Sequence, residues 1–304
     1  MIHQLGGGIS QAIGTGGRDL SADVEGRMTK LAITALAEDP RTRVIVVVSK
    51  APSESVIPSI LASLQQSGKP CIVQFVGWDS EQATSSAAES RVQFASTLAQ
   101  AAHMAVRGAG LQKPLEIANP CESKTVPHIK GHLVGLFCGG TLCQEAWSIL
   151  SQAGLDVVSN VAFSLDKKVN PEQGAPGHAV WDLGDDLFTL GKPHPMIEPS
   201  LRDAKVAAAG EDASIGLVLV DCVLGYGAHA DPATSLAAAA QSAFRSASAQ
   251  GRPFAVLASV TGTDKDPQLR SHQVSILESA GVYVAASNEQ AVRIAIRMLQ
   301  GAGS

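Results

Sequence analysis

Five apolar runs limit what this chain can fold into more than any other feature of its sequence. They cover residues 44–49, 71–77, 133–140, 216–225 and 253–262, without a regular alternation of polar and apolar positions. Strands buried on both faces have this pattern, which is typical of parallel sheets covered by helices on each side. Helical patterns lie between the runs, at 20–38, 54–67, 141–153, 231–248 and 288–300. The sequence therefore predicts an α/β fold with mostly parallel sheets.

Length and charge exclude several classes of protein. A chain of 304 residues can form two domains that each bury a core, and 45% hydrophobic with 17% charged residues fits a folded chain. The net charge of −5 without a basic block argues against nucleic acid as a partner. No apolar run reaches the roughly 18–20 residues of a membrane helix. Since "MIHQLGGGIS" also lacks the features of a signal peptide, we expect no membrane partner.

The cysteines indicate the compartment. They are scattered along the chain as Cys71, Cys121, Cys138, Cys143 and Cys222. An odd number without framework spacing is typical of reduced thiols, so we expect a cytoplasmic protein. Cys138 and Cys143 lack C-x-x-C spacing, and the adjacent Asp185 and Asp186 have no third ligand nearby. We therefore expect no metal site.

The chain contains an internal repeat. Residues 19–50 can be superposed on residues 196–225, because in each a helical pattern leads through an acidic "ED" turn to an apolar strand. About 20 residues later each half has "GKP" or "GRP" and a further strand. The proline-rich segment 111–130 separates the halves, so we predict domains at 1–110 and 131–304 with a linker between them.

The two halves are unequal. The second opens with a complete strand, Gly-Gly turn and helix, "LVGLFCGGTLCQEAWSIL", whereas the first begins with "GGGISQAIGTGG" and has no counterpart of that unit. Two interpretations remain: the chain is truncated at its N-terminus, or another polypeptide supplies the unit. We expect a homo-oligomer or a complex with partner subunits, because an incomplete domain leaves apolar surface uncovered.

Several segments resemble the CoA-ligase part of the succinyl-CoA synthetase superfamily. "ISQAIGTGGRDL", "LAEDPRTRVIVVVSK" and "GKPCIVQFVG" are similar to the α subunit of these synthetases. "HAVWDLGDD" and "IGLVLVDCVLGYGAH" are similar to the C-terminal domain of the β subunit. The resemblance implies two flavodoxin-like, three-layer domains, the first of them incomplete at its N-terminus and without the CoA-binding domain.

Other segments are more specific. "FCGGTLCQEA" and "LGYGAHADPA" resemble FdrA-type members of the superfamily, often labelled acyl-CoA synthetases. Such proteins occur as subunits of a carbamoyltransferase that acts on oxamate. The resemblance implies a small-molecule substrate with an activated acyl or carbamoyl group.

The chain departs from the family pattern at the parts of the synthetases that carry a phosphoryl group from the nucleotide to a histidine. In synthetase α subunits a "GHAGA" segment with the phosphorylated histidine follows the strand that corresponds to 71–77. Here "WDSEQATSSAAESRVQFAST" follows and contains no histidine. The nucleotide-binding domain is absent as well, so we expect no ATP-dependent ligation by this chain alone, although CoA remains a possible ligand.

The turn "CGGTLCQEA" is the strongest candidate for an anion site. Gly139 and Gly140 end a strand, and Thr141 can cap the next helix. The first N–H groups of a helix carry a partial positive charge of about half an electron and bind phosphate well. An ordinary glycine-rich turn is the alternative.

Two further segments offer anion contacts. Gly16 and Gly17 stand beside Arg18, whose guanidinium can bind a phosphate or carboxylate; a surface turn formed by Arg18 and Asp19 is the alternative. The segment "LGDDLFTLGKPHPM" places Lys192 and His194 on one loop, where they could hold a phosphate or a substrate carboxylate.

His229 follows the glycines of "LGYGAHADPA", Gly225 and Gly227, at the end of a buried strand. If the sheet is parallel, this turn and the 138–141 turn face one crevice. The imidazole could donate to a phosphoryl oxygen or act in acid–base catalysis; a structural turn histidine is the alternative. We name His229 and His194 as candidate catalytic residues.

These observations favour a subunit that transfers an acyl or carbamoyl group from its phosphate. Two alternatives stay open. One is an acyl-CoA synthetase subunit whose CoA and nucleotide sites lie on partner chains. The other is a non-catalytic scaffold that retains the fold.

Overall fold

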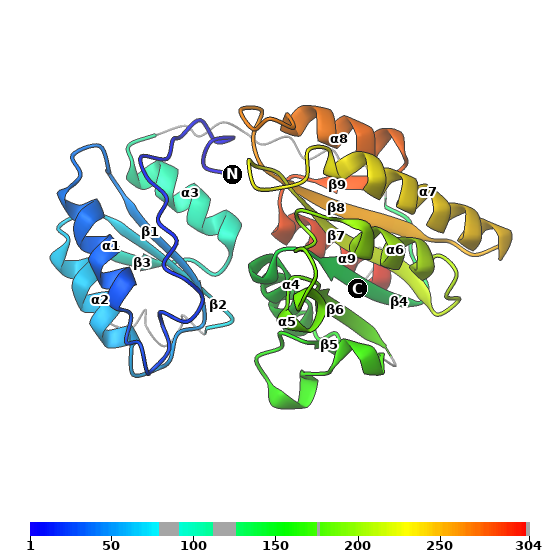
Figure 1. Ribbon diagram of the computed structural model, residues 1–304, viewed down its shortest axis with the longest axis horizontal. Coiled ribbons are helices and arrows are strands. Elements are labelled where there is room, and N and C mark those ends of the chain that lie inside the picture. The colour runs from blue at the N-terminus through cyan, green and yellow to red at the C-terminus, as the bar shows by residue number, and fades with distance from the viewer. Residues whose placement is uncertain (79–90, 112–125, 175–176, 302–304) are drawn as a thin grey trace. The chain divides into compact units, whose positions relative to one another are not determined.

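The computed structural model divides into two compact units, which we call unit 1 (Met1–Ile117) and unit 2 (Ala118–Ser304) (Figure 1). It describes residues 1–78, 91–111, 126–174 and 177–301. The boundary falls within the range predicted as a linker, but residues 112–125, with Cys121, lie outside the described part. None of the described helices is long and apolar enough to cross a membrane.

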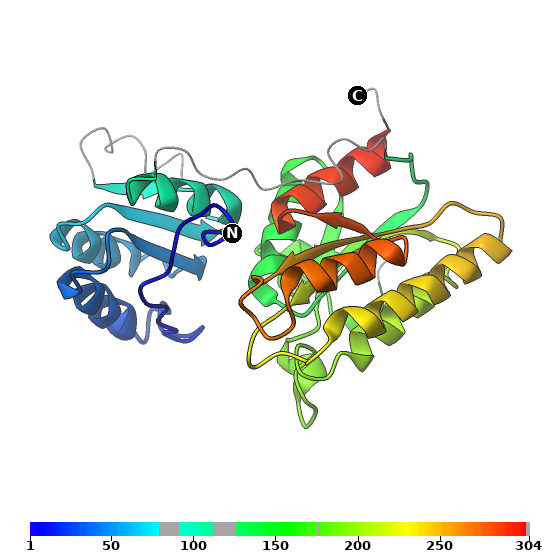
Figure 2. The same ribbon diagram turned by 90° about the horizontal axis from the view of Figure 1, so that it is seen from above.

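Unit 1 is built around a three-stranded parallel sheet with the order β1-β2-β3. Its elements are α1 (Arg27–Glu38), β1 (Ile45–Lys50), α2 (Ile57–Gln66), β2 (Cys71–Val76), β3 (Val92–Phe94) and α3 (Leu98–Gly108). One core lies between the sheet and α1 and α2, where Ile33, Ile60 and Phe75 pack together. A second lies under α3, between Ile72 and Ala105. The unit therefore has three layers, as Figure 2 shows.

Unit 2 contains a six-stranded sheet with the order β5-β6-β4-β7-β8-β9, in which every described pair is parallel. Its strands are β4 (His132–Phe137), β5 (Val157–Ser159), β6 (His178–Asp182), β7 (Ile215–Val223), β8 (Ala255–Thr261) and β9 (Tyr283–Ala285). Its α-helices are α4 (Gly140–Gln152), α5 (Asp186–Thr189), α6 (Ser200–Ala209), α7 (Pro232–Ala249), α8 (Arg270–Ser279) and α9 (Asn288–Gln300).

The central strand β7 explains the apolar pattern of the sequence. Leu217 and Leu219 point into the core below α4 and α9, whereas Val218 and Val220 point into the core below α6, α7 and α8. All four side chains are fully buried. Helices cover both faces of the sheet (Figure 2), so the prediction of an α/β fold with three-layer domains and parallel sheets is confirmed.

The element order repeats between the units. The series α1-β1-α2-β2 in unit 1 corresponds to α6-β7-α7-β8 in unit 2, and β3-α3 corresponds to β9-α9. Residues 79–90, where a counterpart of α8 would stand, lie outside the described residues. Unit 2 has β4, α4, β5 and β6 in addition.

The start of α1 differs from the predicted 20–38. The helix begins at Arg27, after Gly26 in the left-handed conformation with φ 68°. Asp19, which is buried, accepts hydrogen bonds from the N–H groups of Met28 and Thr29 at 2.9 and 2.8 Å and from the Thr29 hydroxyl at 2.6 Å. A carboxylate from the preceding loop therefore satisfies the helix start, and the loop occupies the range that the sequence pattern assigned to helix.

The environment of Asp19 predicts an acid-sensitive helix start. Burial alone would raise the pKa of Asp19, but the hydrogen bonds from Thr29 and Met28 outweigh it and hold the pKa below its usual value. Because the pKa of Asp19 is lower in the folded state, its ionised carboxylate stabilises unit 1 at pH values above the unfolded-state pKa of about 4. This stabilisation is lost as the pH falls through the folded-state pKa. Asp19→Ala should weaken α1 by about 1–2 kcal/mol at neutral pH and by less in acid.

Hydrogen exchange of the α1 amides across pH 3–7 measures this effect. Asp23→Ala, which removes an exposed carboxylate from the same loop, is the matched control. Equal exchange rates in both variants would show that Asp19 does not cap the helix.

Candidate functional site

The turn after β4 lies where the direction of the chain connections changes. From β4 the chain passes through α4 to β5 at the edge of the sheet, returns through β6 beside β4, and then continues to β7 on the other side of β4. The carboxyl ends of β6, β4 and β7 are therefore neighbours, and ligands of open α/β sheets bind at such switch points.

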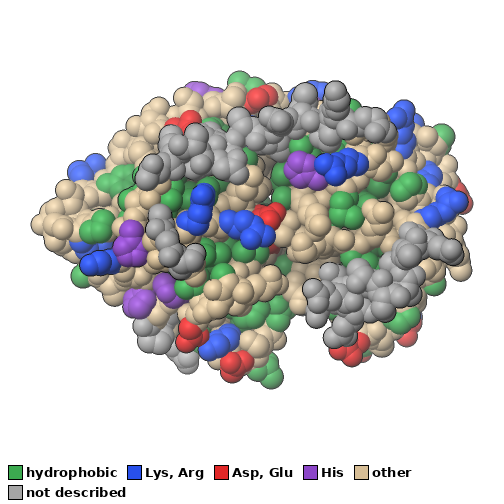
Figure 3. Space-filling model, turned by 180° about the vertical axis from the view of Figure 1, so that it is seen from behind, with side chains coloured by type: hydrophobic (Ala, Val, Ile, Leu, Met, Phe, Trp, Pro, Cys, Tyr) green, Lys and Arg blue, Asp and Glu red, His purple; other side chains and the backbone are tan. Residues whose placement is uncertain are grey.

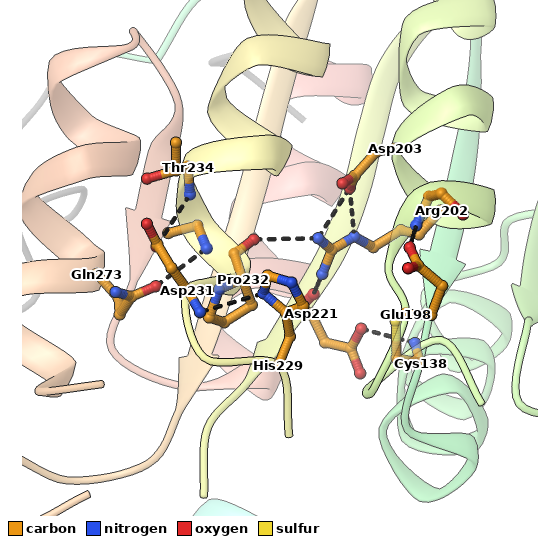
Figure 4. Close-up of polar contacts among 12 residues, drawn as sticks. Cys138, Glu198, Arg202, Asp203, Asp221, His229, Asp231, Pro232, Thr234 and Gln273 are labelled. Carbon is orange, nitrogen blue, oxygen red and sulfur yellow. Dashed lines mark hydrogen bonds and ion pairs between the residues drawn. The ribbon is translucent and has the colours of Figure 1, made fainter. Parts of the chain in front are cut away.

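Asp221 of β7 fixes the turn after β4. Its side chain is fully buried, and one carboxylate oxygen accepts a hydrogen bond from the Cys138 N–H at 2.7 Å (Figure 4). The other oxygen accepts from the Gly139 N–H, also at 2.7 Å. A Cβ on Gly139 would stand only 3.0 Å from Asp221 Oδ2, so the close approach favours glycine. Burial raises the pKa of Asp221, while the two N–H groups and the nearby Arg202 oppose the shift.

Arg202 supports this strand from the face covered by α6. The residue is 1% exposed, and its guanidinium forms an ion pair with Asp203 at 2.8 Å. It also donates to the carbonyl oxygens of Asp221 at 3.3 Å and Pro232 at 3.2 Å, which ties α6 to the end of β7 and the start of α7 (Figure 4). A buried guanidinium is tolerated only when its donors are satisfied in this way.

The start of α4 presents N–H groups with no protein acceptor. Gly139 is the N-cap and forms no side-chain cap hydrogen bond. Its own N–H is occupied by Asp221, but the N–H groups of Gly140, Thr141 and Leu142 have no acceptor among the described residues. A helix start with free N–H groups attracts an anion. The predicted site is thus divided: Gly139 contacts Asp221, whereas Gly140 and Thr141 have free donors.

His194 lies against the same turn. A Cβ on Gly184 would overlap its Nε2 atom and stand 3.0 Å from the Cys138 carbonyl oxygen. Nδ1 of His194 accepts a hydrogen bond from the Met196 N–H at 3.2 Å. The neutral imidazole therefore carries its proton on Nε2, on the side that faces Gly184.

His229 has the same local geometry. Its Nδ1 accepts a hydrogen bond from the Asp231 N–H at 3.1 Å, so its proton is also on Nε2. The His229 N–H donates to the Met196 carbonyl at 2.7 Å, which joins the two histidine loops. The structure thus brings together the turn after β4 and the segments that carry His194 and His229.

Gln268 holds the loop after β7 in place. Its amide exchanges two hydrogen bonds with the backbone of Gly225, at 3.2 and 2.8 Å, and donates to the His229 carbonyl at 3.0 Å. The next residue, Leu269, has φ 56° and is 49% exposed. A leucine in this left-handed region is strained.

The remaining predicted residues lie elsewhere. Lys192 and Gly227 are exposed on loops of unit 2. Gly16, Gly17 and Arg18 belong to unit 1, where Asp19 already occupies the N–H groups at the start of α1. Anion binding by these residues stays a prediction.

Sequence reasoning missed Asp221, Arg202 and Gln268. The first had a usable signal, because a charged residue inside the run "GLVLVDCVLG" must find partners when it is buried. The other two stand in ordinary helical and loop sequence, so nothing in their surroundings indicates a role.

Neither the face seen in Figure 3 nor the metal-ligating side chains of the described residues add a further candidate site. On the face in Figure 3 the basic and acidic side chains of the described residues are interspersed and form no extended basic patch. The described part of the chain also holds no group of three or more His, Cys, Asp or Glu residues that could bind a metal ion.

The contacts of Asp221 predict that even a conservative substitution at this position destabilises unit 2. Asp221→Asn keeps the shape but turns one acceptor into a donor that faces an N–H group. The buried turn then loses a charge-assisted hydrogen bond, and we expect unit 2 to be less stable by about 2–3 kcal/mol. Urea unfolding followed by Trp147 and Trp181 fluorescence measures it, with Asp186→Asn on the surface as the control. A loss no larger than that of the control would contradict the assigned contacts.

Comparisons with known proteins identify a family and several relatives of this chain. The family described as CoA-ligase matches residues 136–298. The uncharacterized protein YahF of Escherichia coli K12 is 35% identical over 294 residues, which are 94% of this chain and 56% of that protein. A Ca. Korarchaeum cryptofilum dinucleotide forming acetyl-coenzyme A synthetase 1, solved with phosphate and ADP and in its apo form, has 14% identity and TM-scores of 0.36 and 0.35.

The alignments with the two synthetase structures cover 88% of this chain and 55% of the synthetase chain. The chain thus spans about half the length of the relatives named here. The family match itself extends over more than half of the chain, including all of β7 and the turn after β4 from Cys138 onward. The chain belongs to the CoA-ligase family.

Proposed function

We propose that the carboxyl edge of the unit 2 sheet binds the phosphate of an acyl or carbamoyl phosphate, and that the chain takes part in transfer of the activated group to an acceptor. One observation carries this proposal: Asp221 fixes the turn after β4, and the N–H groups of Gly140, Thr141 and Leu142 remain free beside it. A phosphate dianion fits three convergent N–H donors.

The reaction needs little from the protein beyond positioning. The acceptor attacks the carbonyl carbon of the mixed anhydride, the bond from that carbon to the phosphate oxygen breaks, and phosphate leaves with the electron pair. The proton of the acceptor passes to phosphate or to solvent. Donors that neutralise the leaving phosphate lower the barrier.

The histidine geometry favours donors over bases. Nε2 of His194 and of His229 carries the proton while Nδ1 accepts from a backbone N–H. An imidazole in this tautomer can donate to a phosphoryl oxygen, but its Nε2 has no lone pair for attack or for proton abstraction. We therefore assign both rings to phosphate binding as hydrogen-bond donors.

Two acceptors suit this chemistry. The resemblance to FdrA-type proteins favours an amide or amine, with oxamate as the example, and hence carbamoyl transfer. The CoA-ligase family match favours the thiol of CoA, and then partner chains would supply the nucleotide site. Product formation from carbamoyl phosphate with oxamate, or from acetyl phosphate with CoA, separates the two. No turnover with either, by the complete complex, favours a non-catalytic scaffold.

A new charge at the helix start should abolish anion binding. Gly140→Asp places a carboxylate about 4 Å from a bound dianion, where like charges repel by about 4 kcal/mol at the effective dielectric near a protein surface. The affinity for phosphate or carbamoyl phosphate should fall by about two orders of magnitude or more. Calorimetric titration measures it, and Gln152→Glu at the other end of α4 is the control. Equal affinities of the two folded variants would remove the anion from this turn.

A substitution at the neighbouring Gly184 can displace the His194 ring while His194 itself stays unchanged. Gly184→Ala adds a methyl group into the space of the His194 Nε2 atom. If His194 donates to phosphate, this substitution should weaken phosphate binding by about as much as His194→Ala, roughly tenfold for one lost hydrogen bond. Titrations of both variants and of their combination provide the check. Additive losses would show that the two substitutions act independently.

The tautomers also predict that no phosphohistidine forms. Phosphorylation at Nε2 requires a lone pair there, and the N–H groups of Met196 and Asp231 fix the opposite tautomer. Incubation with radiolabelled ATP should leave no acid-labile, base-stable phosphate on the chain. Stoichiometric labelling of either histidine would favour a synthetase relay instead of direct transfer.

A further inference from the structure

Arg270 stands at the carboxyl end of the unit 2 sheet, on the side of β8 that faces β9. The Leu224 N–H donates to the Thr261 carbonyl at 2.9 Å, so this carbonyl points to β7. Successive carbonyl groups of a strand point to opposite sides, which turns the Val260 carbonyl toward β9. Arg270 Nε donates to the Val260 carbonyl at 3.1 Å, just past the point where the pairing of β8 with β9 ends.

One edge of the Arg270 guanidinium has no acceptor. Its Nε is occupied by the Val260 carbonyl, whereas Nη1 and Nη2 form no hydrogen bond or ion pair with any described residue. The residue is only partly exposed, and burial lowers the pKa of its guanidinium, an effect that the nearby Asp264 opposes. A partly desolvated cation with free donors gains most from an anionic partner.

The carboxylates of the same loop do not supply this partner. Asp264 accepts a hydrogen bond from the Ser271 N–H at 2.6 Å, and Asp266 accepts from the Thr263 N–H, also at 2.6 Å. Within the described part of the chain, no ion pair joins either carboxylate to Arg270. Both acids thus hold the backbone of the loop, and the Nη1–Nη2 edge of Arg270 stays open.

The backbone before Arg270 fixes the direction of its side chain. Leu269 has the strained φ of 56°, and the Arg270 N–H then donates back to the Thr263 carbonyl at 3.2 Å. On the other side of Leu269, the Gln268 amide donates to the His229 carbonyl. One strained residue therefore lies between a side chain that holds the loop after β7 and a guanidinium that lies against β8. Strain of this kind concentrates at sites that hold a ligand.

The position of Arg270 is separate from the free N–H groups at the start of α4. Those groups follow β4, and the sheet order places β7 and then β8 beside that strand. Neighbouring strands lie 4.7–4.9 Å apart, so two strand spacings separate the two positions by at least about 10 Å. A single phosphate or carboxylate cannot contact both.

We propose that the Nη1–Nη2 edge of Arg270 binds an oxyanion, the phosphate or carboxylate group of a small-molecule ligand. A planar guanidinium presents parallel N–H groups to two oxygens of either anion, and such charge-assisted pairs are stronger than neutral hydrogen bonds. Because other residues form it, this site does not depend on the anion site proposed at the start of α4.

Protection from an arginine reagent tests the proposal on the unmodified chain. Phenylglyoxal modifies accessible guanidinium groups, and mass spectrometry of the peptides follows each arginine separately. Inorganic phosphate or malonate, at constant ionic strength and at ten times the dissociation constant, should slow modification of Arg270 by about tenfold. Arg245, an exposed arginine on α7, is the internal control and should react at the same rate throughout.

The two probes distinguish the two sources of the oxyanion. Stronger protection by phosphate identifies a phosphorylated ligand, and stronger protection by malonate identifies a carboxylate ligand. Gly140→Asp, which blocks the start of α4, should leave the protection of Arg270 unchanged. In that background Arg270→Lys keeps the charge but loses the planar fork, so calorimetric titration with the protecting anion should show about tenfold weaker binding than Arg245→Lys.

Three results would overturn the proposal. One is modification of Arg270 that neither anion slows. Another is an Arg270 that stays unmodified without any anion while Arg245 reacts, because the chain itself would then occupy the guanidinium. The third is loss of protection in folded Gly140→Asp, which would assign the anion to the start of α4. Unchanged protection in Gly140→Asp supports the Arg270 site whether or not the α4 site exists.

Discussion

A buried carboxylate organises the candidate site. Asp221 interrupts an otherwise apolar strand, and its two oxygens take the N–H groups of Cys138 and Gly139. The desolvation of a charge is costly unless hydrogen bonds replace water, and here they do so at the point where β4 turns into α4. The position of the first free N–H groups of α4, and hence of any bound anion, depends on this pair of bonds.

The same backbone geometry sets the chemistry of the histidines. In each loop an N–H two residues further on faces Nδ1, so the ring has one tautomer and a donor directed away from its own backbone. Phosphorylation at Nε2 needs the opposite arrangement, with a lone pair on that atom. The direction of these hydrogen bonds therefore agrees with the donor role proposed for the two rings.

The sequence alone predicted those elements of the fold that depend on the local pattern of apolar residues. The runs at 216–225 and 253–262 are β7 and β8, buried on both faces, and the repeat reappears as corresponding helices and strands. It could not predict contacts between distant residues, such as the 83 positions between Cys138 and Asp221. It also placed the start of α1 too early, because the capping of Met28 and Thr29 by Asp19 is a tertiary contact rather than a property of helix-forming residues.

The strained Leu269 has a cost that selection for stability alone would remove. Glycine adopts φ 56° without strain, so a glycine there would relieve about 1 kcal/mol, yet its flexibility would loosen the neighbouring Gln268. Gln268 bridges the ends of β7 and β8 through Gly225 and His229. The backbone strain of Leu269 is thus stored next to the amide that holds the loop carrying His229 in place.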